Sequence, residues 1–163
     1  MANFNHKAFI KHDDYMTPKH CWVDIKQYIP TDKTILEPFF GDGKSGQYLN
    51  ELGFDVRHEP KDFFDYDIEE SIVVSNPPFS KIPDILTTLV MRNRPFILIM
   101  PCSKMNTQYF RKIFIDIEKP QIIIPKKRIQ FIKNGVDKKG GCSFDCYYYC
   151  WKIGLKRDII WLD

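Results

Sequence analysis

The chain has 163 residues, of which 44% are apolar and 15% aromatic, so it suits one domain with a single hydrophobic core. It contains no apolar run near the roughly 20 residues of a membrane span, and residues 1–6 lack a signal-peptide pattern, which argues against an integral membrane or secreted protein. The formal net charge of +3 permits nucleic acid as a partner without requiring it.

The first predicted elements are a polar arm and a helix. Residues 1–14 are polar, with two histidines and two aspartates, and we expect them to form an arm that precedes a domain at 15–163. Thr17 and Pro18 predict the start of a helix, as its N-cap and its first helical residue. The helix should continue to about residue 29 along an apolar stripe, which comprises Trp22, Ile25, Tyr28 and Ile29.

Alternating strands and helices are predicted over the rest of the chain. Strands are expected at 35–36, 54–58, 72–75, 95–100, 121–124 and 143–151, with 158–162 as a candidate partner of the last. Helices are expected at 45–52, 80–91 and 106–116. Because the two kinds of element alternate, we predict an α/β fold with a mostly parallel sheet and helices on both of its faces.

The five cysteines predict reduced thiols. Their number is odd and no secretion signal precedes them, so we expect an intracellular, cytoplasmic protein. Cys142, Cys146 and Cys150 recur every four residues, a spacing that would place all three on one buried face of a strand. A Cys-x-x-Cys pair is absent, and we therefore expect no metal site.

A glycine-rich motif follows the predicted strand at 35–36. It reads Glu37-Pro38-Phe39-Phe40-Gly41-Asp42-Gly43 and continues to Gly46, which satisfies the pattern G-x-G-x-x-G. Alone, this pattern also fits a nicotinamide dinucleotide site, or a plain glycine turn with Glu37 in solvent. It is not a P-loop, because Pro38 stands where the first glycine of that motif would lie.

A second motif, Asn76-Pro77-Pro78-Phe79, follows the predicted buried strand at 72–75. The exocyclic amine of adenine is a poor nucleophile because its lone pair is delocalised into the ring, and two oxygen acceptors for its N–H bonds would restore its reactivity. Asn76 offers a side-chain carbonyl and Pro77 a backbone carbonyl, held in place by two successive prolines. Phe79 offers a flat face for a base. The alternative is a proline-rich turn with a buried phenylalanine.

Together, the two motifs resemble those of S-adenosylmethionine-dependent amino-methyltransferases that act on the N6 of adenine, above all small stand-alone enzymes of phage and viral type. The resemblance implies a single-domain, Rossmann-like class I methyltransferase fold with a late antiparallel hairpin. It implies a catalytic loop of Asn76, Pro77, Pro78 and Phe79. It also implies that S-adenosylmethionine is bound by Glu37, at its ammonium group, and by Phe39, Gly41, Gly43 and Asn76.

The resemblance extends to segments on either side of the glycine motif. Thr17 and Pro18 match a Thr-Pro segment that closes over the cofactor in one permutation class of these enzymes. Glu59 matches an acid that holds the ribose hydroxyls, and Asp62 and Phe63 match a pair that reads the adenine ring of the cofactor. The ordinary alternatives are a helix cap, a solvated glutamate and an Asp-Phe turn.

Residues 59–71 depart from the family pattern. The family places a helix and a further strand before the strand that leads to the Asn-Pro-Pro loop, and this segment is too short for both. We therefore expect a shortened crossover and the loss of one edge strand. The departure weakens the assignment of Glu59, for which Asp65, Tyr66 and Asp67 are alternatives, although these suit a solvated turn.

The substrate side is predicted in the second half of the chain. Between 126 and 139 there are six basic residues and one acid, which suits either a solvated loop or contacts with a phosphate backbone. In related enzymes an aromatic residue at this place stacks on the flipped adenine, and Phe131 is the candidate, with core packing as the alternative. The candidate substrate residues are Phe79, Lys127, Arg128, Phe131 and Lys133. Residues 142–151 resemble the late hairpin of the fold, with aromatics that suit the core.

The resemblance thus implies transfer of a methyl group from S-adenosylmethionine to adenine N6 in nucleic acid, with DNA favoured over RNA. The chain has no stretch long enough for a separate target-recognition domain, so specificity would come from short loops, residues 1–14, a second copy in a homodimer, or a specificity subunit. Two alternatives from other classes stay open. One is an inactive, nucleic-acid-binding subunit with a methyltransferase fold, and the other is a nicotinamide-dependent oxidoreductase based on Gly41–Gly46.

Overall fold

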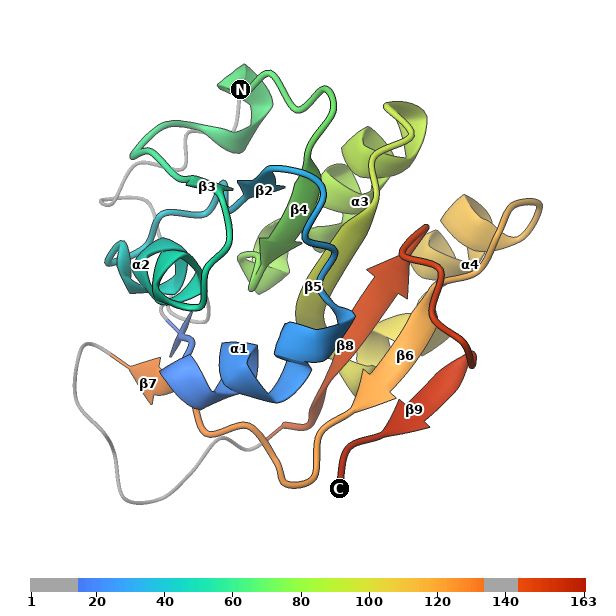
Figure 1. Ribbon diagram of the computed structural model, residues 1–163. Coiled ribbons are helices and arrows are strands. Elements are labelled where there is room, and N and C mark those ends of the chain that lie inside the picture. Colours follow the sequence, from blue (N-terminus) through green and yellow to red (C-terminus); the bar gives the residue numbers. More distant parts are fainter. Residues whose placement is uncertain (1–14, 134–143) are drawn as a thin grey trace.

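The computed structural model describes residues 15–133 and 144–163, and of Lys133 it describes only the backbone (Figure 1). The expected polar arm at 1–14 and the position of Cys142 lie outside these residues. Within them, no helix combines the length and the apolar character that a membrane crossing demands. The described residues form an α/β fold built on one seven-stranded sheet and one two-stranded sheet.

The seven-stranded sheet has the order β3-β2-β4-β5-β8-β6-β9. All of its strands run in the same direction except β8, which is antiparallel to both of its neighbours. The expected mostly parallel sheet is therefore confirmed, with β8 as its antiparallel strand. The strands are β2 (Ile35–Leu36), β3 (Val56–Arg57), β4 (Ile72–Ser75), β5 (Phe96–Pro101), β6 (Gln121–Ile124), β8 (Cys146–Trp151) and β9 (Ile159–Trp161).

The small sheet pairs β1 (Tyr15–Met16) with β7 (Ile132–Lys133) in antiparallel register. The helices of the fold are α1 (Lys19–Ile25), α2 (Lys44–Glu51), α3 (Ile82–Met91) and α4 (Gln108–Phe114), with the 3-10 turns η1 (Lys26–Tyr28), η2 (Phe63–Asp65), η3 (Phe79–Lys81) and η4 (Cys102–Asn106). Most boundaries fall within a few residues of the predicted ones, and β6 matches its prediction.

Helices cover both faces of the large sheet, as predicted, with α1 and α2 on one face and α3 and α4 on the other (Figure 1). The alternation of side chains along β5 explains the two cores. Ile97 and Ile99 pack with Trp22 of α1, whereas Leu98 and Met100 pack with Ile85 of α3. Since both faces are covered, the central strands are buried throughout, which accounts for their continuous apolar sequence.

Two local predictions were wrong. Thr17 does not cap the first helix: α1 begins at Lys19, Pro18 takes the N-cap position, and no side chain caps the helix. Residues 158–162 do not pair with the aromatic strand β8, because β9 lies on the far side of β6 and pairs with it in parallel. The short crossover was predicted correctly, since residues 58–71 contain only η2 between β3 and β4.

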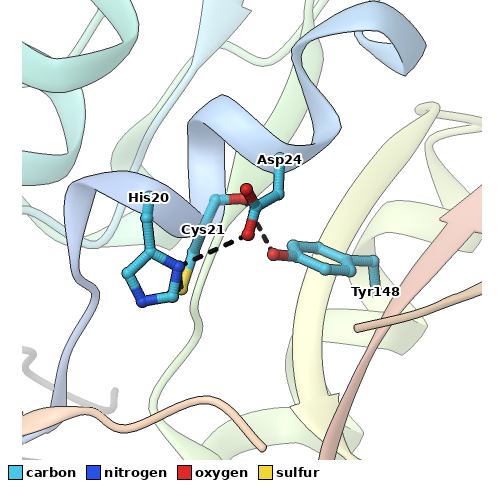
Figure 2. Close-up of polar contacts among 4 residues, drawn as sticks. All are labelled: His20, Cys21, Asp24 and Tyr148. Atoms are coloured by element: carbon cyan, nitrogen blue, oxygen red, sulfur yellow. Dashed lines mark hydrogen bonds and ion pairs between the residues drawn. The ribbon is translucent and has the colours of Figure 1, made fainter. Parts of the chain in front are cut away.

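A hydrogen bond from a buried tyrosine joins α1 to the large sheet. The hydroxyl of Tyr148, on β8, donates a hydrogen bond of 2.8 Å to the backbone carbonyl of Cys21, while His20 lies beside Asp24 on the outer side of the helix (Figure 2). Burial raises the pKa of the Cys21 thiol to about 12, so this cysteine stays protonated and is a poor nucleophile. The cluster therefore positions α1 and carries no reactive thiolate.

The strand order of the large sheet reverses between β2 and β4. The chain leaves β2 through α2 to reach β3 on one side, and then returns to β4 on the other side of β2. Open α/β sheets bind ligands outside the carboxyl ends of the strands at such a reversal, because the connections diverge there and leave a crevice. Both sequence motifs begin at this point, since Glu37 follows β2 and Asn76 follows β4.

Candidate active site

The fold brings the two motifs into direct contact. Ser75, the last residue of β4, donates a hydrogen bond from its hydroxyl to Oε1 of Glu37, just past β2, over 2.5 Å. Both side chains are buried, with 1% of Glu37 and none of Ser75 exposed. The two motifs therefore meet at the carboxyl ends of the neighbouring strands β2 and β4.

Glu37 is a carboxyl group in a nearly dry environment. Its Oε1 accepts hydrogen bonds from Ser75 and, at 2.9 Å, from the backbone N–H of Phe39. Burial raises the pKa of Glu37 to about 8, and it outweighs these two hydrogen bonds, which act in the opposite direction. A cationic group placed against this carboxyl would favour its ionised form, so the position suits an ammonium ligand.

The protonation of Glu37 makes a prediction about stability. The pKa of Glu37 lies near 4.5 in an unfolded chain and near 8 in the fold. The stabilisation that Glu37 contributes is therefore complete below the lower value and is lost as the pH rises through the higher one. The free energy of unfolding in urea should thus fall between these values. Glu37→Gln should flatten the fall, whereas Glu59→Gln, the same change at an exposed carboxyl, should preserve it. An unchanged slope in Glu37→Gln would contradict this prediction.

The glycine loop is shaped by side chains that crowd against its backbone. Gly41 and Gly43 have φ angles of +55° and +79°, which side chains adopt only with strain. A Cβ on Gly41 would lie 3.0 Å from Sδ of Met16, and one on Gly43 would lie 2.9 Å from the ring of Phe40. A larger residue at either position would therefore be strained by its positive φ, whether or not a cofactor binds there.

Gly46 allows α2 to pack against the strand beside it. A Cβ at this position would lie 2.2 Å from Cγ of His58, the residue after β3. The His58 ring also stacks on Phe40, at 5.5 Å between centroids. The third glycine of the G-x-G-x-x-G pattern is thus required for the approach of helix and strand.

Asn76 has one amide atom engaged and one without a partner. Its Nδ2 donates a hydrogen bond of 3.1 Å to the backbone carbonyl of Tyr15, on β1. Its Oδ1 is buried and finds no hydrogen-bond partner among the described residues. Because the Tyr15 carbonyl can only accept, it selects this orientation of the amide. A buried acceptor without a donor is costly, and an N–H group from a ligand would satisfy it.

Four aromatic rings, which we call the aromatic cluster, pack beside Asn76. They come from separate segments and comprise Tyr15, Phe79, Phe131 and Phe144, with centroid distances from 5.4 to 6.4 Å. Phe79 and Phe131, both expected to stack on a base, pack edge-to-face on each other at 6.4 Å. Phe131 is 8% exposed, so in this conformation it takes the core position that was its alternative.

Pro77 and Pro78 are buried, and Pro78 begins η3 as its N-cap. Thr17 is also buried, at 5% exposed, just after the strand that supplies the carbonyl for Asn76, while Pro18 is partly exposed. The Thr-Pro segment therefore follows directly on the strand that contacts the Asn-Pro-Pro loop. Its expected role in cofactor binding stays a prediction.

The residues expected to bind the ribose and adenine of the cofactor differ in their exposure and in their contacts. Glu59 is exposed beyond the end of β3, where it pairs with Lys61 at 3.4 Å. Asp62 caps η2 by accepting from the backbone N–H of Phe64 at 3.0 Å. Phe63 is 1% exposed and packs against Phe39 at 5.3 Å, so its ring belongs to the core and offers no open face.

Tyr66, an alternative to Glu59, has a structural role. Its hydroxyl donates to the backbone carbonyl of Glu59 at 2.6 Å and accepts from the Glu59 N–H at 2.8 Å. This pair of hydrogen bonds to the backbone fixes the start of the short crossover. Asp65 and Asp67 are exposed, as a solvated turn predicts.

The basic segment after β6 is only partly available to a ligand. Lys126 and Lys127 are exposed. Arg128 forms a two-pronged ion pair with Asp145, at 2.7 and 3.0 Å, and this pair holds the pKa of Asp145 below its usual range. Lys133 contributes its backbone to the pairing of β7 with β1. Lys127 and Arg128 are both exposed, but Arg128 is engaged by Asp145.

Three residues of the site were missed in the sequence. Ser75 joins the motifs, Tyr15 orients Asn76, and Phe144 completes the aromatic cluster. A signal existed for Ser75, which is the polar end of an apolar strand and directly precedes the loop. Tyr15 and Phe144 gave none, because their contacts depend on segments distant in the chain.

The chain was compared with known proteins at two levels. No protein-family model matches it, and a search of curated proteins finds no match either. What the site can do must therefore be argued from its own geometry.

Proposed function

We propose that this protein transfers the methyl group of S-adenosylmethionine to the N6 amine of adenine in nucleic acid, with DNA as the favoured substrate. The observation that carries the proposal is the buried Oδ1 of Asn76, an acceptor without a donor among the described residues, at the reversal point of the sheet. It lies in the residue next to Ser75, whose side chain is bonded to the buried carboxyl of Glu37. One acidic and one neutral acceptor thus lie at the same end of the sheet.

The two acceptors suit two different ligands. Glu37 would bind the ammonium end of the cofactor, since a buried carboxylate requires a cationic partner. Phe39 and the backbone at Gly41 and Gly43 lie on the same loop and would flank it. When bound, S-adenosylmethionine supplies a methyl group that is activated for displacement by its positive sulfur. These residues would hold that methyl group still while the amine approaches.

Asn76 would act on the nucleophile. Its Oδ1 accepts one N–H of the adenine amine, and the Pro77 carbonyl would accept the other, which draws electron density back onto the nitrogen. The new bond forms between N6 and the methyl carbon as the bond from that carbon to sulfur breaks, and the extra proton on nitrogen then leaves to water. No titrating base is needed, so catalysis would rest on positioning and on fixed dipoles.

A purine can reach Asn76 only if the aromatic cluster separates. Tyr15 and Phe131 belong to or adjoin β1 and β7, which pair with each other and, among the described strands, with no strand of the large sheet. Because the Tyr15 carbonyl orients Asn76, the backbone of β1 would stay in place while the rings of the cluster turn aside. Once displaced, the rings of Phe79 and Phe131 would provide the stacking faces that an extruded base requires.

The proposal is tested by methyl transfer from tritiated S-adenosylmethionine to single- and double-stranded DNA and RNA in parallel. Incorporation should require adenine and should vanish when purine, which lacks the amine, replaces it. Binding of oligonucleotide without incorporation would identify a binding subunit instead. A response to nicotinamide dinucleotide and none to S-adenosylmethionine would overturn the proposal.

Lys126 and Lys127 are expected to bind the phosphate backbone. Changing both to glutamine should weaken DNA binding and lower the slope of log K against log salt by about 0.7–0.9 for each phosphate that is no longer neutralised. Lys112→Gln provides the matched control, because Lys112 is exposed on α4, which covers the opposite face from α1. Binding measured by fluorescence anisotropy between low and high salt decides the question. An unaltered slope in the double variant would favour the alternative interpretation, in which this segment is a solvated loop.

A further inference from the structure

Ser75 connects the two motifs of the proposed site through a hydrogen bond. Its hydroxyl donates to Oε1 of Glu37, which also accepts from the Phe39 N–H. Ser75 is fully buried at the carboxyl end of β4, and the other three residues of this strand are apolar. A hydroxyl is costly at such a place unless it is bonded, and it is bonded to Glu37.

We propose that Ser75 is a positioning residue: its hydroxyl holds the Glu37 carboxyl in place and favours the ionised form that a ligand ammonium needs. The inference rests on the proposed function, because it assigns Glu37 to the ammonium end of the cofactor. It goes further in naming a residue that touches neither ligand and acts through Glu37. A donor to a carboxylate stabilises the charged form relative to the neutral form, which is the direction required here.

Among the described residues, few groups surround Glu37 that could stabilise its ionised form. The hydrogen bonds that reach its carboxyl come from neutral donors on β4 and on its own loop. After η2, burial raises the pKa of Tyr66, and the charge of Glu37 adds to the increase. On β3, the Arg57 guanidinium lies 5.8 Å from the Tyr66 ring. Tyr66 is itself bonded to the Glu59 backbone, so within the described part of the chain Ser75 is the side chain that stabilises the carboxylate directly.

The first test needs no ligand. In protein labelled with carbon-13 at the glutamate side-chain carboxyl, the resonance that titrates near pH 8 is assigned to Glu37 by its loss in Glu37→Gln. In Ser75→Ala its midpoint should rise by about one unit or more, because hydrogen bonds to charged groups are among the stronger ones. In Ser75→Thr, which retains the hydroxyl, it should return toward the original value. An unmoved midpoint in Ser75→Ala would overturn the inference.

The second test uses calorimetric binding of S-adenosylhomocysteine, which carries the same ammonium group, between pH 6 and 9. As the ionised fraction of Glu37 falls tenfold for each unit, Ser75→Ala should bind about tenfold weaker at pH 7, or about 1.4 kcal/mol. The pH range over which the affinity for S-adenosylhomocysteine increases should move to higher pH. Methylthioadenosine, which lacks the ammonium, should show neither effect. In a Glu37→Gln background, Ser75→Ala should change the pH profile no further.

The outcomes separate the two proposals. If the wild-type protein binds neither nucleoside ligand, the proposed cofactor site fails, and the role of Ser75 in binding fails with it. If the wild-type protein binds both ligands and Ser75→Ala weakens them equally at every pH, the cofactor site stands and the positioning role is overturned. Circular dichroism and thermal unfolding of each variant show that the comparison is made between folded proteins.

Discussion

Replacing Asn76 with alanine is expected to reduce methyl transfer by about a hundredfold or more, the loss that follows removal of one fixed hydrogen-bond partner from a reacting group. The affinity for S-adenosylmethionine should change by only a few fold, because Glu37 and the glycine loop remain. Single-turnover transfer to an adenine-containing duplex measures the first quantity and calorimetry the second. Retention of full activity would remove Asn76 from the catalytic role.

Asn76→Asp is the matched variant. It keeps an oxygen acceptor and nearly the same shape, but a carboxylate cannot donate to the Tyr15 carbonyl as Nδ2 does. We therefore expect activity between that of the wild type and that of Asn76→Ala. If Asn76→Asp and Asn76→Ala were equally inactive, orientation by Tyr15 would be essential. If Asn76→Asp were fully active, the Tyr15 bond would be dispensable.

Gly46→Ala is expected to have the largest effect on stability. In an open helix this change stabilises by about 0.5–1 kcal/mol, because alanine restricts the unfolded chain and favours the helix. Here the new Cβ would lie 2.2 Å from the His58 ring, so α2 or His58 must shift. We expect a net loss of about 1–3 kcal/mol in the free energy of unfolding, measured in urea.

A double-mutant cycle separates the clash from other effects. Removing the ring with His58→Ala should be mildly destabilising alone, through loss of its stacking on Phe40. In the His58→Ala background the Gly46→Ala change should reverse sign and stabilise, because the ring that opposed the new methyl group is gone. A loss of similar size in both backgrounds would show that the His58 ring is not the cause.

The sequence predicted which site residues lie at strand ends, because it predicted where the strands themselves end. Glu37 and Asn76 follow short apolar runs, and parallel strands expose their carboxyl ends at one edge, so their placement at the same edge of the sheet follows from the pattern. The buried face of α3 and the bounds of β6 were predicted for a related reason, because periodicity indicates which side chains face a core.

The failures share a different origin. The hydrophobicity of Phe63 and Phe131 is compatible with either a core or a binding face, and composition cannot choose between them. The pairing of β9 with β6 depends on which strand edge remains free after the sheet has formed. Thr17 does not take its predicted capping role because the helix begins only at Lys19, which leaves the N-cap position to Pro18.

What the sequence determined by itself is local: alternating elements, two motifs at strand ends, and glycines where the backbone must turn or pack closely. These properties depend on neighbouring residues and on the periods of helix and strand, which the chain carries in linear order. The tertiary structure alone decided that Ser75 meets Glu37, that Tyr15 orients Asn76, and that four distant rings pack beside it. The first contact arises from the order of strands in the large sheet, and the other two from the docking of the small β1–β7 sheet and of distant loops beside it.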